Sequence, residues 1–198
     1  MMKETVDTLG NQKKVNYALR ENMTREEFIK EVTDGLAPPP KYFPLNVKMN
    51  KSGYDSIDRV LSRGLNPLGP DSFEAIAKET DALILDVRHQ DEFVKGYVPQ
   101  SVFIGLDGGF APWVGTLIGD VNQPLLIIAP EEREEETITR LSRVGFDQTL
   151  GYLDGGFNSW KKSGKEYDTI TQVNAENLEK LAKEENMLVF DVRKENEF

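Results

Sequence analysis

The chain has 198 residues, 38% hydrophobic and 29% charged, a composition typical of one buried core with flanking material. Its net charge of −10 argues against nucleic-acid and membrane partners, and without a long apolar run or signal sequence the expected location is cytoplasmic. The absence of cysteine and the single histidine exclude disulfides, thiolate nucleophiles and His-rich metal sites within this chain.

The first predicted element is a helix that starts at Thr24. Thr24 and Glu27 match a capping box, and Gly35 is placed to end the helix. The apolar residues expected to face inward are Phe28, Ile29 and Val32. The three prolines at 38–40 then force an extended path. Residues 41–53 contain apolar side chains without a clean period, which predicts an irregular arm.

An internal repeat dominates the rest of the chain. The segment DSFEAIAKETDALILDVRHQDEF, Asp71 to Phe93, returns as ENLEKLAKEENMLVFDVRKENEF, Glu176 to Phe198, at an offset of 105 residues. Ten of the 23 aligned positions are identical, including the DVR triplet. The repeating unit therefore spans about 105 residues, and the second copy is a start of a unit that cannot bury a core alone. We expect the chain to be a piece of a longer protein.

Within the complete unit, strands alternate with helices. Asp71 is the expected N-cap of a helix, and a buried strand ends at Asp86. Further short apolar runs predict strands at 102–104, 125–128 and 149–153, and helical spacing predicts helices at 137–144 and 155–163. This order predicts an α/β fold: a mostly parallel sheet flanked by helices and preceded by a helical and irregular N-terminal arm.

Several motifs in this unit occur in the order typical of one family. Asp86-Val87-Arg88 ends a strand, Glu92-Phe93 follows, and Gly96-Tyr97-Val98-Pro99 comes next. Leu-Asp-Gly-Gly-Phe lies at 153–157, where Gly155 and Gly156 are expected because side chains would collide at the turn into the helix. From Pro70 to Thr169 the chain resembles the rhodanese family, and the resemblance restarts at Asn174. The resemblance implies a rhodanese-like fold.

Rhodaneses carry sulfur on a cysteine that begins a C-x-x-G-x-R loop after a strand. Here Ala129 stands where the cysteine belongs, and Pro130 removes an N–H from the loop that would surround the sulfur. The degenerate loop comprises Ala129, Pro130, Glu131, Glu132, Arg133 and Glu134. No glycine allows the backbone to curl, the loop looks about one residue shorter, and neighbouring glutamates would repel an anionic substrate. The resemblance thus implies no catalytic residue.

Two interpretations remain open for the charged residues. The glutamates at 131–136 form either a solvated helix start or an acidic docking patch. Asp86 and Arg88 form either an ion pair that braces the strand end or, together with Arg133, part of a reused pocket. His89 is interpreted as an exposed polar position, because it aligns with Lys194 in the repeat.

The leading segment resembles the C-terminal end of a metallo-β-lactamase-fold hydrolase. The residues that carry this resemblance run from Thr5 to Leu19 and from Phe28 to Asn46. They are similar to bacterial fusions of a persulfide dioxygenase domain with rhodanese modules. We therefore assign residues 1–53 to the end of a metallo-β-lactamase-fold domain, 54–170 to a rhodanese-like domain without cysteine, and 171–198 to the truncated start of a second one.

The resemblance implies a role in sulfide and persulfide detoxification. The parent would combine a persulfide dioxygenase with a sulfurtransferase and act on a low-molecular-weight persulfide. Its non-haem iron, or zinc, would lie in the metallo-β-lactamase domain, and no cofactor is expected in this chain. The module itself is expected to be non-catalytic and to scaffold other domains of its chain, with homo-oligomerisation possible; the alternative is a ligand- or peptide-binding module that reuses the degenerate pocket.

Overall fold

The computed structural model describes residues 6–20, 22–36, 39, 42–184 and 188–193. The chain divides into two compact units, Met1–Pro39 and Pro40–Phe198. Of the three prolines at 38–40, for which an extended path is expected, only Pro39 is among the described residues. The last five residues of the repeat, 194–198, lie outside them. None of the helices in the described ranges combines the length and apolarity that a membrane crossing needs.

The first unit is helical. It contains α1 (Leu9–Val15), a short 3-10 helix (Tyr17–Leu19) and α2 (Arg25–Thr33). Both hydrogen bonds of the predicted capping box at the start of α2 are present. Gly35 has a φ of 70°, the left-handed conformation that ends helices. The expectation that Phe28 and Ile29 face inward is wrong, because their side chains are 41% and 46% exposed.

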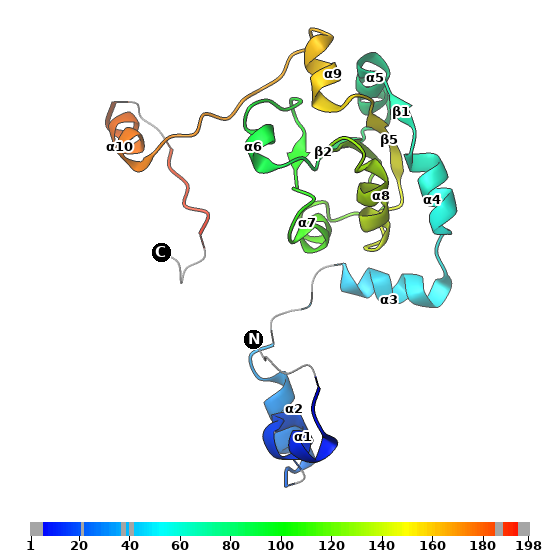
Figure 1. Cartoon of the computed structure of the whole chain (residues 1–198), viewed down its shortest axis with the longest axis vertical. Helices are drawn as coiled ribbons and strands as arrows, with labels where there is room; N and C mark the ends of the chain where they lie inside the picture. The colour runs from blue at the N-terminus through cyan, green and yellow to red at the C-terminus, as the bar shows by residue number, and fades with distance from the viewer. Residues whose placement is uncertain (1–5, 21, 37–38, 40–41, 185–187, 194–198) are drawn as a thin grey trace. The chain divides into compact units, whose positions relative to one another are not determined.

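The second unit is built around a five-stranded parallel sheet (Figure 1). Its strands are β1 (Pro67–Leu68), β2 (Leu83–Asp86), β3 (Val102–Phe103), β4 (Leu125–Ile128) and β5 (Thr149–Leu153). The strand order is β1-β5-β4-β2-β3, and every pairing is parallel. The predicted α/β class is confirmed, and β1 is a strand too short for an apolar pattern to indicate.

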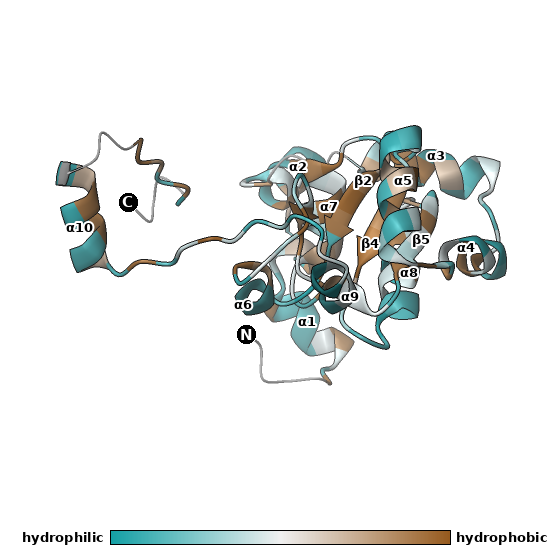
Figure 2. Ribbon diagram, turned by 90° about the horizontal axis from the view of Figure 1, so that it is seen from above, coloured by the Kyte–Doolittle hydropathy of each residue, from teal (hydrophilic) through white to brown (hydrophobic). Residues whose placement is uncertain are grey.

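Helices cover both faces of this sheet. The helices of the second unit are α3 (Phe43–Ser52), α4 (Ile57–Gly64), α5 (Pro70–Thr80), α6 (Gln90–Phe93), α7 (Phe110–Leu117), α8 (Glu134–Ser142), α9 (Gly156–Lys162) and α10 (Ala175–Glu184), of which α10 contributes to neither hydrophobic cluster. Residues of α4, α7 and α8 share one hydrophobic cluster, and residues of α5 and α9 share another. Figure 2 shows hydrophobic β2 and β4 flanked by helices with hydrophilic surfaces.

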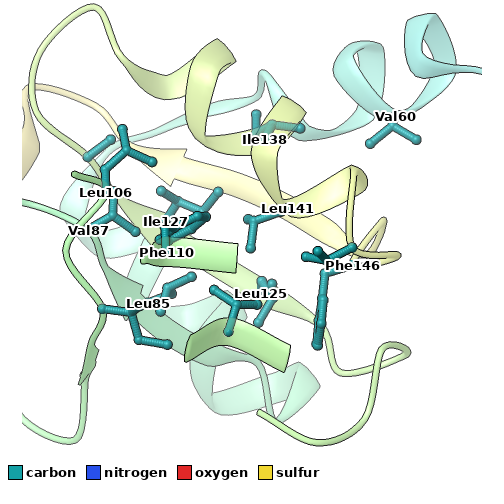
Figure 3. Packing of buried hydrophobic residues seen from close by; sticks show 14 residues of the cluster. Val60, Leu85, Val87, Leu106, Phe110, Leu125, Ile127, Ile138, Leu141 and Phe146 are labelled. Carbon is teal, nitrogen blue, oxygen red and sulfur yellow. The ribbon is translucent and has the colours of Figure 1, made fainter. Parts of the chain in front are cut away.

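Strand β4 illustrates why the sequence reads as a continuous apolar run. Leu125 and Ile127 belong to the cluster beneath α7 and α8, whereas Leu126 and Ile128 belong to the cluster beneath α5 and α9. All four side chains are fully buried, because successive residues of a strand point to opposite faces. Figure 3 shows the first cluster, in which Phe110, Ile138 and Leu141 pack near Ile127.

Two helix predictions need correction. Helix α5 begins at Pro70 with Gly69 as its N-cap, so Asp71 lies inside the first turn; the fixed φ of proline suits the first helical position. The segment 41–53 is not an irregular arm, because Phe43–Ser52 forms α3 with a proline in its first turn. This helix buries none of its residues completely, which explains why its sequence lacks a clear period.

Two close contacts join α3 and its N-cap Tyr42 to the rest of the second unit. A Cβ atom on Gly115 of α7 would lie 2.1 Å from the Tyr42 ring, and one on Gly145 would lie 2.8 Å from the sulfur of Met49. Residues 42–52 therefore pack against elements of the rhodanese-like part of the second unit, namely α7 and the turn at Gly145. The assignment of all of 1–53 to a different fold stays a prediction.

Candidate functional site

The site begins where strand β4 ends. Ala129 follows Ile128 and is only 5% exposed, and the chain then turns through Pro130 and enters α8 with Arg133 as N-cap. The loop closes through a hydrogen bond from the Arg133 N–H to the Pro130 carbonyl, 3.1 Å long. The methyl group of Ala129 thus occupies a nearly dry position at the carboxyl edge of a parallel sheet, where α/β proteins place ligands.

The loop curls even though it lacks glycine. Glu132 adopts a φ of 65°, in the left-handed region that glycine enters at no steric cost. The sequence-based expectation that the backbone cannot curl here is therefore wrong. An exposed glutamate takes the strained conformation instead.

Replacing Glu132 with glycine is expected to leave the protein as stable or to stabilise it by about 1 kcal/mol, because the strain is relieved. Glu131→Gly is the matched control, since Glu131 is a neighbouring exposed glutamate without a positive φ. This control should lose about 0.5–1 kcal/mol through the greater backbone entropy of glycine. Urea unfolding of both variants measures the difference, and equal losses would contradict the assignment of strain to Glu132.

A pocket of about 650 Å³ opens beside Ala129. Its lining residues come from the loop, from the start of α9 and from the segment after β2: Arg88, Glu92, Lys95, Ala129, Pro130, Glu131, Glu134, Tyr152, Asp154, Gly155, Gly156, Phe157, Asn158 and Lys161. Burial raises the pKa of the Tyr152 phenol, and the negative charges of Glu134 and Asp154 raise it further. The lining carries charges of both signs, with carboxylates from Glu92, Glu131, Glu134 and Asp154 and cationic groups from Arg88, Lys95 and Lys161.

The floor of the pocket contains a buried ion pair. Arg88 Nη2 lies 2.6 Å from Asp86 Oδ2, its Nε donates to both carboxylate oxygens, and Nη2 also donates to the Gly96 carbonyl at 2.8 Å. The guanidinium carbon lies 4.5 Å from the centre of the Phe157 ring. The predicted brace at the strand end is thus present. Burial raises the pKa of the Asp86 carboxyl, and the hydrogen bonds and charge of Arg88 oppose that shift.

The same local geometry recurs in the repeat. Arg193 Nε lies 3.0 Å from both oxygens of Asp191, and its backbone N–H donates to Oδ1 at 2.9 Å, as the Arg88 N–H does to Asp86 at 3.1 Å. In this second copy the pair is exposed rather than buried. The Asp-Val-Arg motif therefore forms its pair from local chain geometry alone.

Arg133 points elsewhere. Its Nη2 and Nη1 lie 2.9 and 3.2 Å from the oxygens of Asp107, and its Nε lies 2.8 Å from Glu136. It is not among the residues that line the Ala129 pocket. Asp107 lines a neighbouring pocket of about 480 Å³, which also contains the exposed Trp113.

The structure therefore brings together only part of the predicted set. Five members line the pocket: Ala129, Pro130, Glu131, Glu134 and Arg88. Asp86, Glu132 and Arg133 do not. Asp86 is fully buried, and Arg133 binds Asp107 and Glu136 instead. Sequence reasoning missed Lys95, Tyr152, Asp154, Asn158 and Lys161, single polar residues without a motif of their own.

The paired glycines after β5 shape one wall of this pocket. Gly155 and Gly156 have φ values of 66° and 56°. A Cβ on Gly156 would lie 3.6 Å from the Ala129 carbonyl oxygen, an ordinary contact, and one on Gly155 would lie 3.1 Å from the Ser159 Cβ. The main reason for both glycines is thus the left-handed backbone, with the expected collision limited to a tight contact at Gly155.

Two further predictions concern His89 and metal binding. The exposed His89 accepts a hydrogen bond from the Asp91 N–H at the start of α6, which matches its interpretation as a surface position. Within the part of the chain that the structure describes, no group of three or more His, Asp and Glu side chains could hold a metal ion.

Comparisons with known proteins agree with this geometry. The family model "Rhodanese-like domain" matches residues 69–163, from the N-cap of α5 to the end of α9. Residues 69–163 have a rhodanese-like fold. The chain finds no match among curated protein sequences.

Several solved structures are similar to parts of this chain. A metallo-beta-lactamase from Staphylococcus aureus is 22% identical, with a TM-score of 0.56 over 74% of this chain and 40% of its own length. A rhodanese-like domain from Anabaena is 16% identical, with a TM-score of 0.42 over 48% of this chain and 98% of its own. A Pseudomonas aeruginosa thiosulfate sulfurtransferase is 19% identical, with a TM-score of 0.46 over 64% of this chain and 25% of its own. This chain spans less than half of the first and third of these proteins.

Proposed function

We propose that the rhodanese-like domain is a non-catalytic module that positions other domains in a multidomain protein of sulfide and persulfide metabolism. The observation that carries this proposal is Ala129, a buried methyl group at the end of β4 where the resemblance calls for the sulfur-carrying thiolate. A methyl group cannot attack a sulfur donor, and the chain contains no cysteine to replace it.

The surroundings of Ala129 support the same proposal. Pro130 has no N–H to donate to an oxyanion, and Glu131 and Glu134 line the pocket beside it. Three glutamates fill the first turn of α8, at the positive end of the helix dipole. The carboxylates of Glu131 and Glu134 would repel a sulfur donor such as thiosulfate beside Ala129, and the cations of the lining, Arg88, Lys95 and Lys161, come from other segments.

The nature of the longer parent protein is also a proposal. The Staphylococcus aureus metallo-beta-lactamase is about two and a half times as long as the part that this chain spans. This supports a longer parent that contains a metallo-β-lactamase-fold domain. We propose that this domain, with non-haem iron or zinc, oxidises a low-molecular-weight persulfide, as the sequence resemblance implies. The partners of the module would then be other domains of its own chain or a second copy, in the cytoplasm.

Thiosulfate:cyanide transfer tests the loss of chemistry directly. We expect the purified chain to form no thiocyanate above the no-protein control, whereas a catalytic rhodanese assayed in parallel does. In a longer protein that contains the module, its deletion should leave persulfide oxidation intact and weaken coupling to a downstream rhodanese. Thiocyanate turnover by the chain would refute the non-catalytic assignment, and unchanged coupling would refute the positioning role.

Restoring the cysteine should not restore activity. The Ala129→Cys thiol would be buried beside carboxylates, and both effects raise a thiol pKa above its ordinary value of about 8.5. We expect no thiocyanate turnover at neutral pH, and alkylation by iodoacetamide whose rate rises only above about pH 9. Lys162→Cys, on the exposed side of α9, is the control and should titrate near the ordinary value. Fast alkylation of Cys at 129 below pH 8 would show that the loop still stabilises a thiolate.

A second candidate function rests on the open pocket. If the domain had become purely structural, side chains could have filled the space beside Ala129, yet about 650 Å³ remains. This volume matches that of pockets that bind small molecules or short peptide segments. A ligand-binding role is therefore the alternative to a positioning role.

A further inference from the structure

Residues 164–170, which follow α9, lie along the rhodanese-like part of the chain and are bonded to it. Tyr97 and Asp168 form an antiparallel bridge, in which each N–H donates to the other's carbonyl oxygen at 2.9 and 3.0 Å. Two residues further on, the Ile170 N–H donates to the Val94 carbonyl oxygen at 2.9 Å. We call residues 164–170 the strap.

Side chains hold the first half of the strap. Lys165 Nζ lies 2.9 Å from Asp71 Oδ1 and 2.7 Å from Glu74 Oε2, both on α5, and the Lys165 side chain is only 17% exposed. The indole N–H of Trp160 on α9 donates to the Glu166 carbonyl oxygen at 2.8 Å. The strap is thus attached to α5 and α9 as well as to the segment that follows α6.

Tyr167 packs the middle of the strap against residues that line the Ala129 pocket. Its ring lies edge-on to the Phe157 ring, 5.8 Å between centres, and Lys161 Nζ lies 5.1 Å from the centre of the Tyr167 ring. Phe157 and Lys161 both line the pocket. A Cβ atom on Gly96 would lie 2.7 Å from the Phe157 ring and 3.3 Å from the Tyr167 ring, so glycine at this position makes room for both rings.

The strap ends beside the same pocket. Ile170 is bonded to Val94, and the next residue along, Lys95, lines the pocket. Residues 171–174 connect this point to α10; they are exposed and, among the described residues, make no hydrogen bond with the sheet or its helices α3 to α9. A free chain of this length spans at most about 14 Å, whereas one that began at 164 would span up to about 40 Å.

We propose that the strap fixes the place where the chain leaves the rhodanese-like fold, and so keeps the segment from α10 onward on a short tether beside the Ala129 pocket. A short tether raises the effective concentration of the attached segment at nearby surfaces. The inference rests on the positioning role proposed above and gives it a physical basis. Tyr167, Asp168 and Ile170 are then positioning residues.

The distance between two spin labels tests the strap in the full chain. The chain contains no cysteine, so Glu79→Cys on α5 and Gln172→Cys, both at exposed positions, carry the only nitroxide labels. Pulsed electron paramagnetic resonance measures the spread of the distance between them. With the strap attached, the two free residues up to the second label contribute a spread of about 8 Å, and we expect this result. Without the strap, nine free residues would contribute about 17 Å.

Two pairs of prolines separate the hydrogen bonds of the strap from other effects of proline. Asp168→Pro/Ile170→Pro removes both N–H donors, and the spread should rise at least about 1.5-fold. Thr169→Pro/Thr171→Pro is the matched control, because neither of these N–H groups donates a hydrogen bond within the described structure. The control should keep the spread of the wild-type strap.

A further variant frees the rest of the strap. Adding Lys165→Ala and Tyr167→Ala to the first proline pair should bring the rise to about twofold. Thermal unfolding verifies that each variant is folded, and the unsubstituted strap gives a result even where a variant is not. A spread near 17 Å for the unsubstituted strap, no broadening by the first proline pair, or equal broadening by the control pair would overturn the inference.

These distances are independent of the tests of the proposed function. A loose strap would leave the non-catalytic assignment to the thiocyanate assay, because the strap carries no reacting group. Unchanged coupling after deletion of the module, together with a narrow distance distribution, would refute the positioning role and leave the strap as a structural feature.

Discussion

Replacing Arg88 with alanine is expected to lower the free energy of unfolding by about 3–5 kcal/mol, because the substitution leaves a buried carboxylate without its partner. Asp86 is fully buried and Arg88 is 7% exposed. The variant also loses the hydrogen bond to the Gly96 carbonyl and the contact with the Phe157 ring. Urea unfolding monitored by circular dichroism measures the loss.

The repeat supplies a matched control for this substitution. Arg193 makes the same contacts with Asp191 through the same local geometry, but that pair is exposed. Arg193→Ala should therefore change the stability by no more than about 0.5 kcal/mol, as is usual for exposed ion pairs. Equal losses from both substitutions would mean that burial of Asp86 is not the cause.

The Arg88→Ala variant should also depend on pH in a defined direction. Without Arg88, burial and the negative charge of Glu92 act on Asp86 and hold its pKa in the folded state above the unfolded value. The folded state then binds more protons than the unfolded state, so stability falls as the pH rises. Lowering the pH from about 7 to about 5 should recover part of the lost stability in Arg88→Ala but not in Arg193→Ala.

The sheet was predictable because its central strands are buried on both faces. Continuous apolar runs such as 83–85 and 125–128 have few structural explanations when helical segments separate them. The repeat strengthened this prediction, because the same helix-to-strand pattern occurs twice. These features depend on local sequence. The structure confirms both strands of the complete unit, whereas in the second copy it forms α10 but no strand within the described residues 188–193.

The elements that sequence reasoning missed depend on contacts from distant residues. Helix α7 contains Pro112 and Gly115, which argue against a helix, yet Pro112 lies in the first turn where its missing N–H has no cost. Gly115 accommodates the Tyr42 ring, a contact that no local pattern encodes. Helix α3 likewise packs through Met49 and Tyr42 rather than through an apolar stripe.

The site likewise contains residues that local sequence places and residues that only distant contacts place. Motif order placed Ala129 at the edge of the sheet, and the Asp-Val-Arg pair needed only neighbouring residues. The direction of Arg133 was not predictable, because it depends on Asp107, 26 residues earlier, which sequence alone does not connect with it. Lys95 and Asp154 reach the pocket only because the fold brings the segment after β2 near the end of β5.

Replacing Trp160 with alanine is expected to cost about 3–5 kcal/mol, and the chain's other tryptophan provides the comparison. Trp160 of α9 is 4% exposed, lies edge-on to the Phe73 ring at 6.3 Å, and donates its indole N–H to the Glu166 carbonyl at 2.8 Å. Trp113 of α7 is 59% exposed, so Trp113→Ala should change stability by no more than about 0.5 kcal/mol. Because each variant keeps one tryptophan, fluorescence reports unfolding in both. A small loss from Trp160→Ala would show that α9, and with it the glycine wall of the Ala129 pocket, is not anchored through this side chain.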